Sequence, residues 1–377
     1  MTQNILNEEQ YNILRLVRSV NSTHLNLHKL VETYDSFTEI IKNIHKINNK
    51  VILAPEDNIK KEIEEHNKIG AKIITYIDDD YPILLKQSES FPFVLSCKGN
   101  LNLLNNTKTV AIIGSRNCSI NSFNFSKKTA QEVSNYGYVI VSGLARGIDS
   151  SAHLGSLQNG TIAVLGSGID VIYPKENDYL YREIIHNNGL IVSELPIHSS
   201  PKPEYFIMRN RIIAGLARGV LVMEAGISSG TMHTVRQALK LNREVMIFPG
   251  SPYDDRCLGS NRLLQDGAIM VIDTKDVVNC LESFVINDCF NDSNFHYEVE
   301  NNNSLFVEQY KKDMEDDIKE KTIEEEILSK LDYTPISINE VVDNLNYDVS
   351  SINSTITKLQ LNKKVIVTAG MVCLRLE

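Results

Sequence analysis

Short polar loops that contain glycine and a cation recur in the middle of the sequence, and several could bind phosphate. The first comprises Gly114, Ser115 and Arg116, which follow an apolar run and precede a helix predicted from about Asn121. A glycine turn at a helix N-terminus exposes backbone N–H groups, and arginine adds a planar cation that suits phosphate. This loop is a candidate anion site, although a tight turn with a surface arginine explains an isolated G-S-R equally well.

Two similar loops follow the next two apolar runs. Glycine allows a ligand to approach the backbone closely or permits a positive φ, so we include these loops in the candidate site. A lysine after a Tyr-Pro break is predicted to be exposed, where it can contact phosphate. The candidate residues of these loops are Gly143, Arg146, Gly166, Ser167, Gly168 and Lys175.

Three charged or titratable residues near these loops also have structural explanations. Arg146 could pair with Asp149 or Asp170 inside the fold instead of contacting a ligand. Asp170 follows a glycine turn, where an aspartate is more often a cap than a catalyst. His153, beside small residues in a predicted helix, is expected to be a packed or capping histidine. We therefore predict no catalytic residue here.

Residues 201 to 215, PKPEYFIMRNRIIAG, place two aromatic residues among cations. Single-stranded nucleic acid needs a flat face on which bases stack and cations that follow the phosphates. One aromatic could instead fill the core below the loop, and adjacent side chains of an extended loop point to opposite sides, so we expect one to stack and the other to pack. The candidates are Lys202, Tyr205, Phe206, Arg209, Asn210 and Arg211.

A fourth loop, Ser229, Gly230 and Thr231, precedes a helical pattern that begins at about Val235. Its N–H and hydroxyl groups could donate to an anion at the helix N-terminus, a role compatible with ordinary capping. The chain contains neither G-x-G-x-x-G nor G-x-x-x-x-G-K-[ST], which disfavours standard dinucleotide and P-loop sites.

Composition limits the class of protein. The net charge is −10, but residues 107 to 275 carry 17 Lys/Arg against 14 Asp/Glu, so the middle can hold a positive groove. Six scattered cysteines without C-x-x-C argue against disulfides and zinc, and we expect no metal or other cofactor. Without a secretory N-terminus or a membrane-spanning run, a soluble, cytoplasmic protein is expected.

The elements that position these loops form three parts. Residues 1–68 show apolar spacings of three and four and predict several short helices. In residues 69–283, β-branched runs that end in glycine alternate with amphipathic helices, which predicts a Rossmann-like α/β domain with a parallel sheet. Ligands of such sheets bind at the carboxyl ends of the strands, where these loops lie.

The remaining sequence changes character twice. Residues 284–321 predict an acidic, flexible or solvated linker. In residues 322–377, three helix-like segments precede two strands joined by a glycine turn, which suggests a winged helix.

Taken together, these segments resemble the DNA-processing protein A family, called DprA or Smf. The shared stretches, in the family's order across about residues 70 to 273, are GSR, SGLARGIDSSAH, VLGSGIDVIYPKEN, RNRIIAGLARGVLVMEA, SSGTMHT and FPGS with GSNRLLQDGA. The resemblance implies a homodimer, formed through the Rossmann-like domain, that binds and protects incoming single-stranded DNA and helps load a RecA-type recombinase in natural transformation. It also implies a helical domain resembling a sterile alpha motif before the sheet and a winged helix after it.

By this resemblance, Arg116 and Lys175 match phosphate-binding positions, Lys202 with one aromatic neighbour matches a stacking segment, and the S-S-G-T turn matches a glycine-serine pocket. Met208 departs from the family, which often has a more basic or proline-containing approach to R-N-R, and the acidic linker departs as well.

Two other classes compete. AGISSGTMHT faintly echoes the P-G-G-x-G-T-x-x-E loop of lysine decarboxylase-like nucleotide hydrolases, but His233 replaces the required glutamate, and we expect a protein that is not an enzyme. A partner-docking adaptor is the other, because residues 322–377 carry 5 Lys/Arg against 8 Asp/Glu, which suits duplex phosphates poorly.

Overall fold

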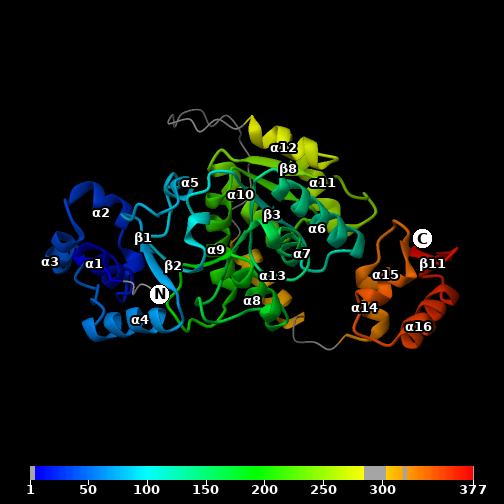
Figure 1. Ribbon diagram of the computed structural model, residues 1–377, viewed down its shortest axis with the longest axis horizontal. Coiled ribbons are helices and arrows are strands. Elements are labelled where there is room, and N and C mark those ends of the chain that lie inside the picture. Colours follow the sequence, from blue (N-terminus) through cyan, green and yellow to red (C-terminus); the bar gives the residue numbers. More distant parts are fainter. Residues whose placement is uncertain (1–4, 284–302, 317–320, 377) are drawn as a thin grey trace.

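The computed structural model describes residues 5–283, 303–316 and 321–376. Along the longest axis, a helical unit at one end is followed by a central sheet with its helices, and a small unit lies at the other end (Figure 1). Among the described residues, no helix is both long and apolar enough to cross a bilayer.

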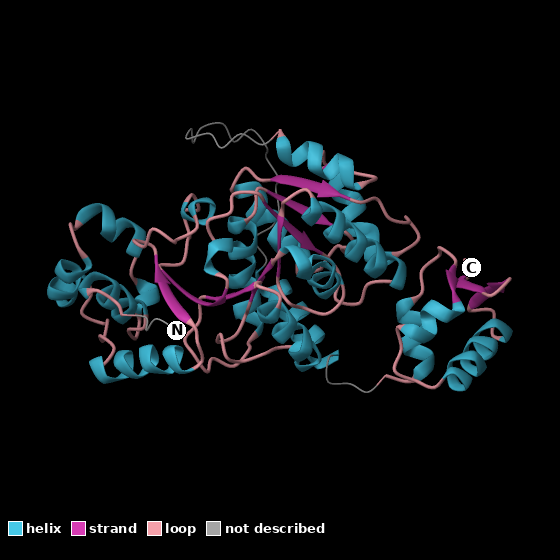
Figure 2. Cartoon of the chain, in the orientation of Figure 1, coloured by secondary structure: helices cyan, strands magenta, loops and turns pink. Residues whose placement is uncertain are grey.

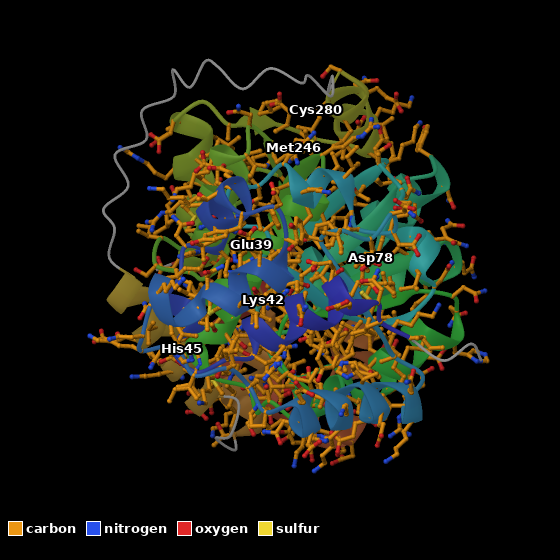
Figure 3. The ribbon with its side chains drawn as sticks, turned by 90° about the vertical axis from the view of Figure 1, so that its left-hand side faces the viewer. Glu39, Lys42, His45, Asp78, Met246 and Cys280 are labelled. Atoms are coloured by element: carbon orange, nitrogen blue, oxygen red, sulfur yellow. The ribbon has the colours of Figure 1, made fainter. Side chains whose placement is uncertain are left out.

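The N-terminal unit consists of short helices whose apolar faces meet. Helix α3 buries Phe37, Ile40 and Ile44, while Glu39, Lys42 and His45 lie on its outer side, toward the viewer in Figure 3. Side-chain caps begin three of the helices, as expected for Asn and Ser at these positions. The predicted short helices are α1 Glu8–Val17, α2 Leu27–Thr33, α3 Phe37–Ile47 and α4 Glu56–Lys68.

The central sheet has nine strands in the order β1-β2-β6-β5-β4-β3-β7-β8-β9. Strands β3 to β9 are mutually parallel, and β1 and β2 form an antiparallel pair that joins the edge through β6. The β-branched runs predicted to be strands form β3 to β9, whereas β2 was not predicted. The bounds are β1 Lys72–Thr75, β2 Val94–Gly99, β3 Thr109–Ile113, β4 Val139–Ser142, β5 Thr161–Val164, β6 Leu190–Ser193, β7 Gly219–Val222, β8 Glu244–Ile247 and β9 Ile269–Met270.

Helices cover both faces of this sheet (Figure 2). One core joins alternate strand residues to α5, α9, α10 and α11, and the cores on the other face join the strands to α6, α7, α8 and α12. The Rossmann-like α/β core predicted from the sequence is confirmed, with a mixed, mostly parallel sheet. The bounds are α5 Ile83–Lys86, α6 Ile120–Asn135, α7 Ile148–Ser156, α8 Asp178–His186, α9 Pro203–Leu216, α10 Thr231–Lys240, α11 Leu258–Gln265 and α12 Thr274–Glu282.

The C-terminal unit packs three helices on a three-stranded sheet of order β10-β12-β11. The Arg256 guanidinium donates to the carbonyl oxygens of Ser329 and Leu331, at 2.9 and 2.8 Å, and so joins this unit to the central one. The predicted helices and hairpin are present. Their bounds are α14 Ile323–Lys330, β10 Ile336–Ser337, α15 Ile338–Asp343, α16 Val349–Leu361, β11 Val365–Thr368 and β12 Met371–Leu374.

Within residues 284–321, the structure corrects the prediction of a flexible or solvated linker. Residues Asn303–Asp316 form helix α13, which packs against α9 of the central unit. The parts of this segment at 284–302 and 317–320 lie outside the described residues.

Candidate functional site

A cavity of about 350 Å³ opens at the carboxyl ends of β3 and β7. Its walls come from the loops after β3, β4 and β7, from the first turn of α10, from α9 and from α13. We call it the strand-end cavity. The predicted residues that line it are Gly114, Ser115, Arg116, Arg209, Asn210, Ser229, Gly230 and Thr231.

Two hydrogen bonds to Ser115 hold the loop after β3. The N–H of Ile148 donates to the Ser115 carbonyl at 3.2 Å, and the Asn117 N–H donates to the Ser115 hydroxyl at 3.2 Å. These bonds hold Arg116 beside the cavity, where its guanidinium carbon lies 4.6 Å from the ring centroid of Tyr310 and 5.5 Å from that of Phe206. Its cation therefore lies beside two aromatic rings.

The loop after β7 brings a helix N-terminus to the same cavity. Helix α10 begins at Thr231, with Gly230 as its cap, so the helix starts four residues earlier than the pattern predicted. The Thr231 hydroxyl donates to the Gly114 carbonyl at 3.1 Å and ties the two loops together. The Gly114 loop thus meets the N-terminus of α10, a contact that was not predicted, because the sequence paired this loop with the helix from about Asn121. Such a helix end favours anions.

Arg209 requires a correction, because it is buried and only 4% of it is exposed. Its Nη1 donates to the carbonyl oxygens of Gly143 and Val164, at the ends of β4 and β5. A Cβ on Gly143 would lie 2.0 Å from this nitrogen, so Gly143 makes room for the arginine and not for a ligand. Both residues have structural roles at the bottom of the cavity.

Asp149 supports this arrangement. Its carboxylate accepts N–H groups of Gly143 and Ala145 at 3.1 and 3.4 Å. Burial raises the pKa of Asp149, while the nearby Arg209 guanidinium opposes that shift; burial also lowers the pKa of Arg209. The pair thus stabilises the loop after β4 from within.

His153 and Asp170 behave as predicted. His153 is fully buried with its Nδ1 2.8 Å from the Thr161 hydroxyl, and burial lowers its pKa to about 3. Asp170 accepts the backbone N–H of His198 at 2.7 Å and also contacts the His198 ring. Both side chains have structural partners.

Two further arginines pair with carboxylates. Nη2 of Arg211 donates to both carboxylate oxygens of Glu194, at 2.5 and 2.6 Å, and neither residue lines the strand-end cavity. Arg146 Nε lies 3.6 Å from the Glu176 carboxylate, a partner that was not among those predicted from the sequence. Arg211 thus has a structural ion-pair partner, and its role in DNA binding stays a prediction.

The loop after β5 is also packed against its own chain. A Cβ on Gly166 would lie 2.6 Å from the Phe206 ring, and one on Gly168 would lie 2.8 Å from the backbone nitrogen of His198. The Ser167 hydroxyl donates to the Val171 carbonyl at 2.6 Å. These three residues therefore shape the loop from inside, and their contact with a ligand stays a prediction, whereas Lys175 is exposed as predicted.

The aromatic and basic segment begins α9 and is not the extended loop that was predicted. Lys202 is exposed at the helix cap, with its Nζ 5.5 Å from the ring centroid of Tyr205. Tyr205 is half-buried, whereas Phe206 is 4% exposed and packs beside Tyr173. Phe206 is the packed aromatic, and Tyr205 is the one that solvent can reach.

Sequence reasoning missed Tyr310 of α13, which lines the cavity and accepts a hydrogen bond from the Asn210 amide at 3.1 Å. The signal was present, because Val307, Tyr310 and Met314 recur at spacings of three and four. The acidic composition around them masked this helical stripe.

Beside the cavity, Glu224, Asp254 and Cys257 lie with their possible ligand atoms within 4.8 Å of one another. Both carboxylates already have hydrogen-bond partners: Arg256 donates to both carboxylate oxygens of Asp254, and Glu224 accepts from the hydroxyls of Ser119 and Ser122. Burial raises the pKa of both Glu224 and Cys257. This cluster has the character of a structural hydrogen-bond network.

The comparisons with known proteins agree on one protein family. Residues 72–282 match the family model described as DNA recombination-mediator protein A. The chain is 45% identical over 204 residues to DNA processing protein DprA of Streptococcus pneumoniae, covering 54% of this chain and 71% of that protein. It is 39% identical over 244 residues to protein Smf of Synechocystis, covering 63% of this chain and 61% of that protein.

Two solved structures are similar. The X-ray structure of DprA from Streptococcus pneumoniae aligns with a TM-score of 0.57 and 33% identity over 74% of this chain and 94% of that one. The structure of DNA processing protein A from Helicobacter pylori, described for its unique single-stranded DNA binding mode, aligns with a TM-score of 0.52 and 31% identity over 56% of this chain and 95% of that one.

Proposed function

Because the chain belongs to the DNA recombination-mediator protein A family, we propose that it binds single-stranded DNA at the strand-end cavity and along the start of α9. The observation that carries the proposal is the meeting of the Gly114 to Arg116 loop with the N-terminus of α10. Backbone N–H groups at a helix end and an arginine together suit a phosphate, and they need no particular base.

The start of α9 favours the binding of single-stranded DNA over duplex DNA. Tyr205 is half-buried with the Lys202 cation beside its ring, so an aromatic face and a charge are both within reach of a strand. Unpaired bases stack on such faces, whereas bases within a duplex are already stacked on one another. Lys175 adds an exposed cation on the loop after β5.

Family membership and the relatives' names extend the proposal. Those relatives are DNA processing proteins, and one is described by its single-stranded DNA binding mode. We infer that this chain acts on DNA by binding it and not by catalysis, that it protects incoming strands in transformation, and that it helps load a RecA-type recombinase. A homodimer formed through the central unit would join two DNA tracks by two-fold symmetry.

The division of the chain is part of the same proposal. We propose residues 1–68 as a helical domain resembling a sterile alpha motif, 69–283 as the DNA-binding domain and 322–377 as a winged helix. The acid excess of this last part favours contact with a protein partner over duplex DNA.

The test compares labelled single-stranded and duplex oligonucleotides by fluorescence anisotropy over a range of salt concentrations. We expect tighter binding of the single strand, little dependence on sequence, and a log–log salt slope of about −0.7 for each neutralised phosphate. Arg116→Ala and Lys175→Ala should each weaken binding and flatten the slope. Lys128→Ala on α6, a cation with 69% side-chain exposure outside the cavity, is the control.

Equal affinity for duplex and single strand, or wild-type affinity and slope in both variants, would place the DNA elsewhere on the molecule. Light scattering on the same samples should give a mass near twice 42.5 kDa if the homodimer forms.

A further inference from the structure

Helix α13 brings a side chain from outside the sheet domain into the strand-end cavity. Tyr310 is 4% exposed, and its ring lies nearly parallel to that of Phe206, with an interplanar angle of 9° and centroids 5.7 Å apart. The Arg116 guanidinium carbon is 4.6 Å from the Tyr310 centroid, and the Asn210 amide donates to the Tyr310 hydroxyl. The ring thus has an aromatic neighbour, a cationic neighbour and a hydrogen-bond donor at its polar edge.

These are the contacts that proteins use for an unpaired nucleobase. Bases stack on aromatic rings and guanidinium planes, while amide side chains meet their polar edges. Gly230 permits the close fit, because a Cβ at that position would lie 2.6 Å from the Tyr310 ring. A flat ring therefore fits this place, which we call the ring slot and define by Phe206, Arg116, Asn210 and Gly230.

We propose that Tyr310 occupies a nucleobase slot and makes α13 an intramolecular competitor for single-stranded DNA. The inference rests on the proposed function. When α13 withdraws, the ring slot accepts a base, and the loops of the strand-end cavity become accessible to its phosphate. The protein thereby limits its own binding of DNA until a strand displaces the helix.

The remaining contacts of α13 suit a helix that can leave. Among its side chains whose burial the structure describes, Tyr310 alone is buried; Val307, Gln309 and Met314 are half-buried, and the others are exposed. A helix of 14 residues is marginal by itself in water, so its place depends on packing, and among the side chains whose burial is described Tyr310 contributes the most buried contact.

Charge favours the same role. The sequence of α13 holds four acidic residues against two lysines, and one of the acids, Glu308, is exposed beside the cavity-lining Gln309. A segment of negative charge at a site for phosphate resembles the ligand that it excludes. DNA and α13 would therefore bring charge of the same sign to this site, and both would contact Arg116.

The competition lowers apparent affinity by the fraction of molecules in which the cavity is open. Loss of the ring stack in Tyr310→Ala should raise that fraction and tighten the apparent Kd for a single-stranded oligonucleotide about tenfold. Tyr310→Phe keeps the ring and loses only the Asn210 hydrogen bond, so it should tighten binding less. Met314→Ala, a half-buried truncation on the same helix outside the cavity lining, is the matched control and should remain near wild type.

Hydrogen exchange provides a second test of the competitor role that does not depend on a measured affinity. Amides of α13 in the wild-type protein should lose protection when oligonucleotide saturates the site, because the helix leaves its packing surface. Amides of α10 should gain protection in the same experiment. Thermal unfolding of each variant confirms that the sheet domain remains folded.

The outcomes separate this inference from the proposed function. Weaker binding by Tyr310→Ala, or protection of α13 by DNA, would make Tyr310 part of the binding surface and overturn the competitor role. Unchanged affinity in Tyr310→Ala with wild-type binding intact would overturn it as well. If neither wild type nor Tyr310→Ala binds single strands, the proposed function itself fails.

Discussion

The glycines of the loops after β4 and β5 differ from those of the loop after β7, although all three loops lie at the same edge of the sheet. After β4 and β5, Gly143, Gly166 and Gly168 face atoms of the protein's own interior, with hypothetical Cβ contacts of 2.0, 2.6 and 2.8 Å. After β7, Gly226 has only ordinary contacts and Gly230 faces Tyr310 of α13. The glycines after β4 and β5 are enclosed by the fold, whereas those after β7 border the cavity.

This difference shows that a glycine-rich loop does not by itself identify a ligand site. A missing side chain can make room for a ligand or for another side chain of the same protein, and the sequence looks the same in both cases. Here Arg209 fills the space beside Gly143 and Phe206 fills the space beside Gly166. Substitutions at the glycines after β4 and β5 should therefore lower stability more than a substitution at Gly226 after β7.

The largest expected effect is on stability, from Arg209→Met. This change removes the donor to the Gly143 and Val164 carbonyls and leaves Asp149 buried without its cation, at a cost of about 3–5 kcal/mol in the free energy of unfolding. Urea unfolding measures it. Arg262→Met on α11, where 69% of the side chain is exposed, should change stability by less than about 0.5 kcal/mol. If the Arg209→Met protein were stable but failed to bind DNA, Arg209 would have to contact the DNA directly.

Gly143→Ala and Gly226→Ala compare the two kinds of loop directly. The Cβ at 143 would meet a guanidinium that two carbonyls hold in place, so we expect a loss of about 1–3 kcal/mol in unfolding free energy. The Cβ at 226 would lie no closer than 3.4 Å to its nearest neighbour, and stability should be almost unchanged. Equal losses in the two variants would remove the distinction between the loops.

Phe206→Leu and Tyr205→Leu make the same comparison within one turn of α9. Phe206 is 4% exposed between Gly166 and Tyr310, and its replacement should lower the free energy of unfolding by about 1–3 kcal/mol. Replacement of the half-buried Tyr205 should leave the thermal midpoint nearly unchanged and weaken single-strand affinity by about 1–3 kcal/mol. Calorimetry and anisotropy on both variants are the measurements. Wild-type affinity in folded Tyr205→Leu would show that bases stack elsewhere.

The smallest effect concerns pH and the loop after β5. The hydrogen bond with Asp170 raises the pKa of His198, which also lies 3.2 Å from the Glu65 carboxylate of α4. A raised folded-state pKa stabilises the protein fully below the ordinary value of about 6.5, and this contribution is lost as pH rises through the raised value. Because 63% of the side chain is exposed, we expect less than about 1 kcal/mol.

Urea midpoints of wild type and His198→Asn, compared from about pH 6 to about pH 8, measure this contribution. Asparagine tolerates the positive φ of 65° at this position, so the backbone conformation can be kept. A difference between the two proteins that grows as pH rises would have the wrong sign for the His198 to Asp170 interaction.

The sequence was most informative where local pattern and tertiary packing agree. The β-branched runs of β3, β4 and β5 became strands because both faces of each strand are buried, so their near-continuous apolar character is unambiguous. Strand β2 was missed, because Val94–Gly99 ends in Ser, Cys, Lys and Gly, and its position depends on antiparallel pairing with β1 and β6.

The candidate site was predicted in place but not in detail. Arg209 and Arg211 stand two residues apart in R-N-R, yet one reaches the strand carbonyls and the other reaches Glu194. Which way each points depends on how α9 is rotated against the sheet, and no local pattern encodes this rotation. The place of Tyr310 in the cavity was not predicted for another reason. Its partners Phe206 and Asn210 lie about 100 residues earlier in the chain.

The hydrophobic core of the N-terminal unit has a consequence for how the chain unfolds. It contains Ile13 and Phe37 from the helices together with Ile73, Phe93 and Val94 from β1 and β2, so the proposed boundary at residue 68 passes through one continuous core. Separation of the helices from the sheet would expose apolar surface on both sides. The helical unit and the sheet should therefore lose structure in a single cooperative transition, and neither can act as a freely tethered module.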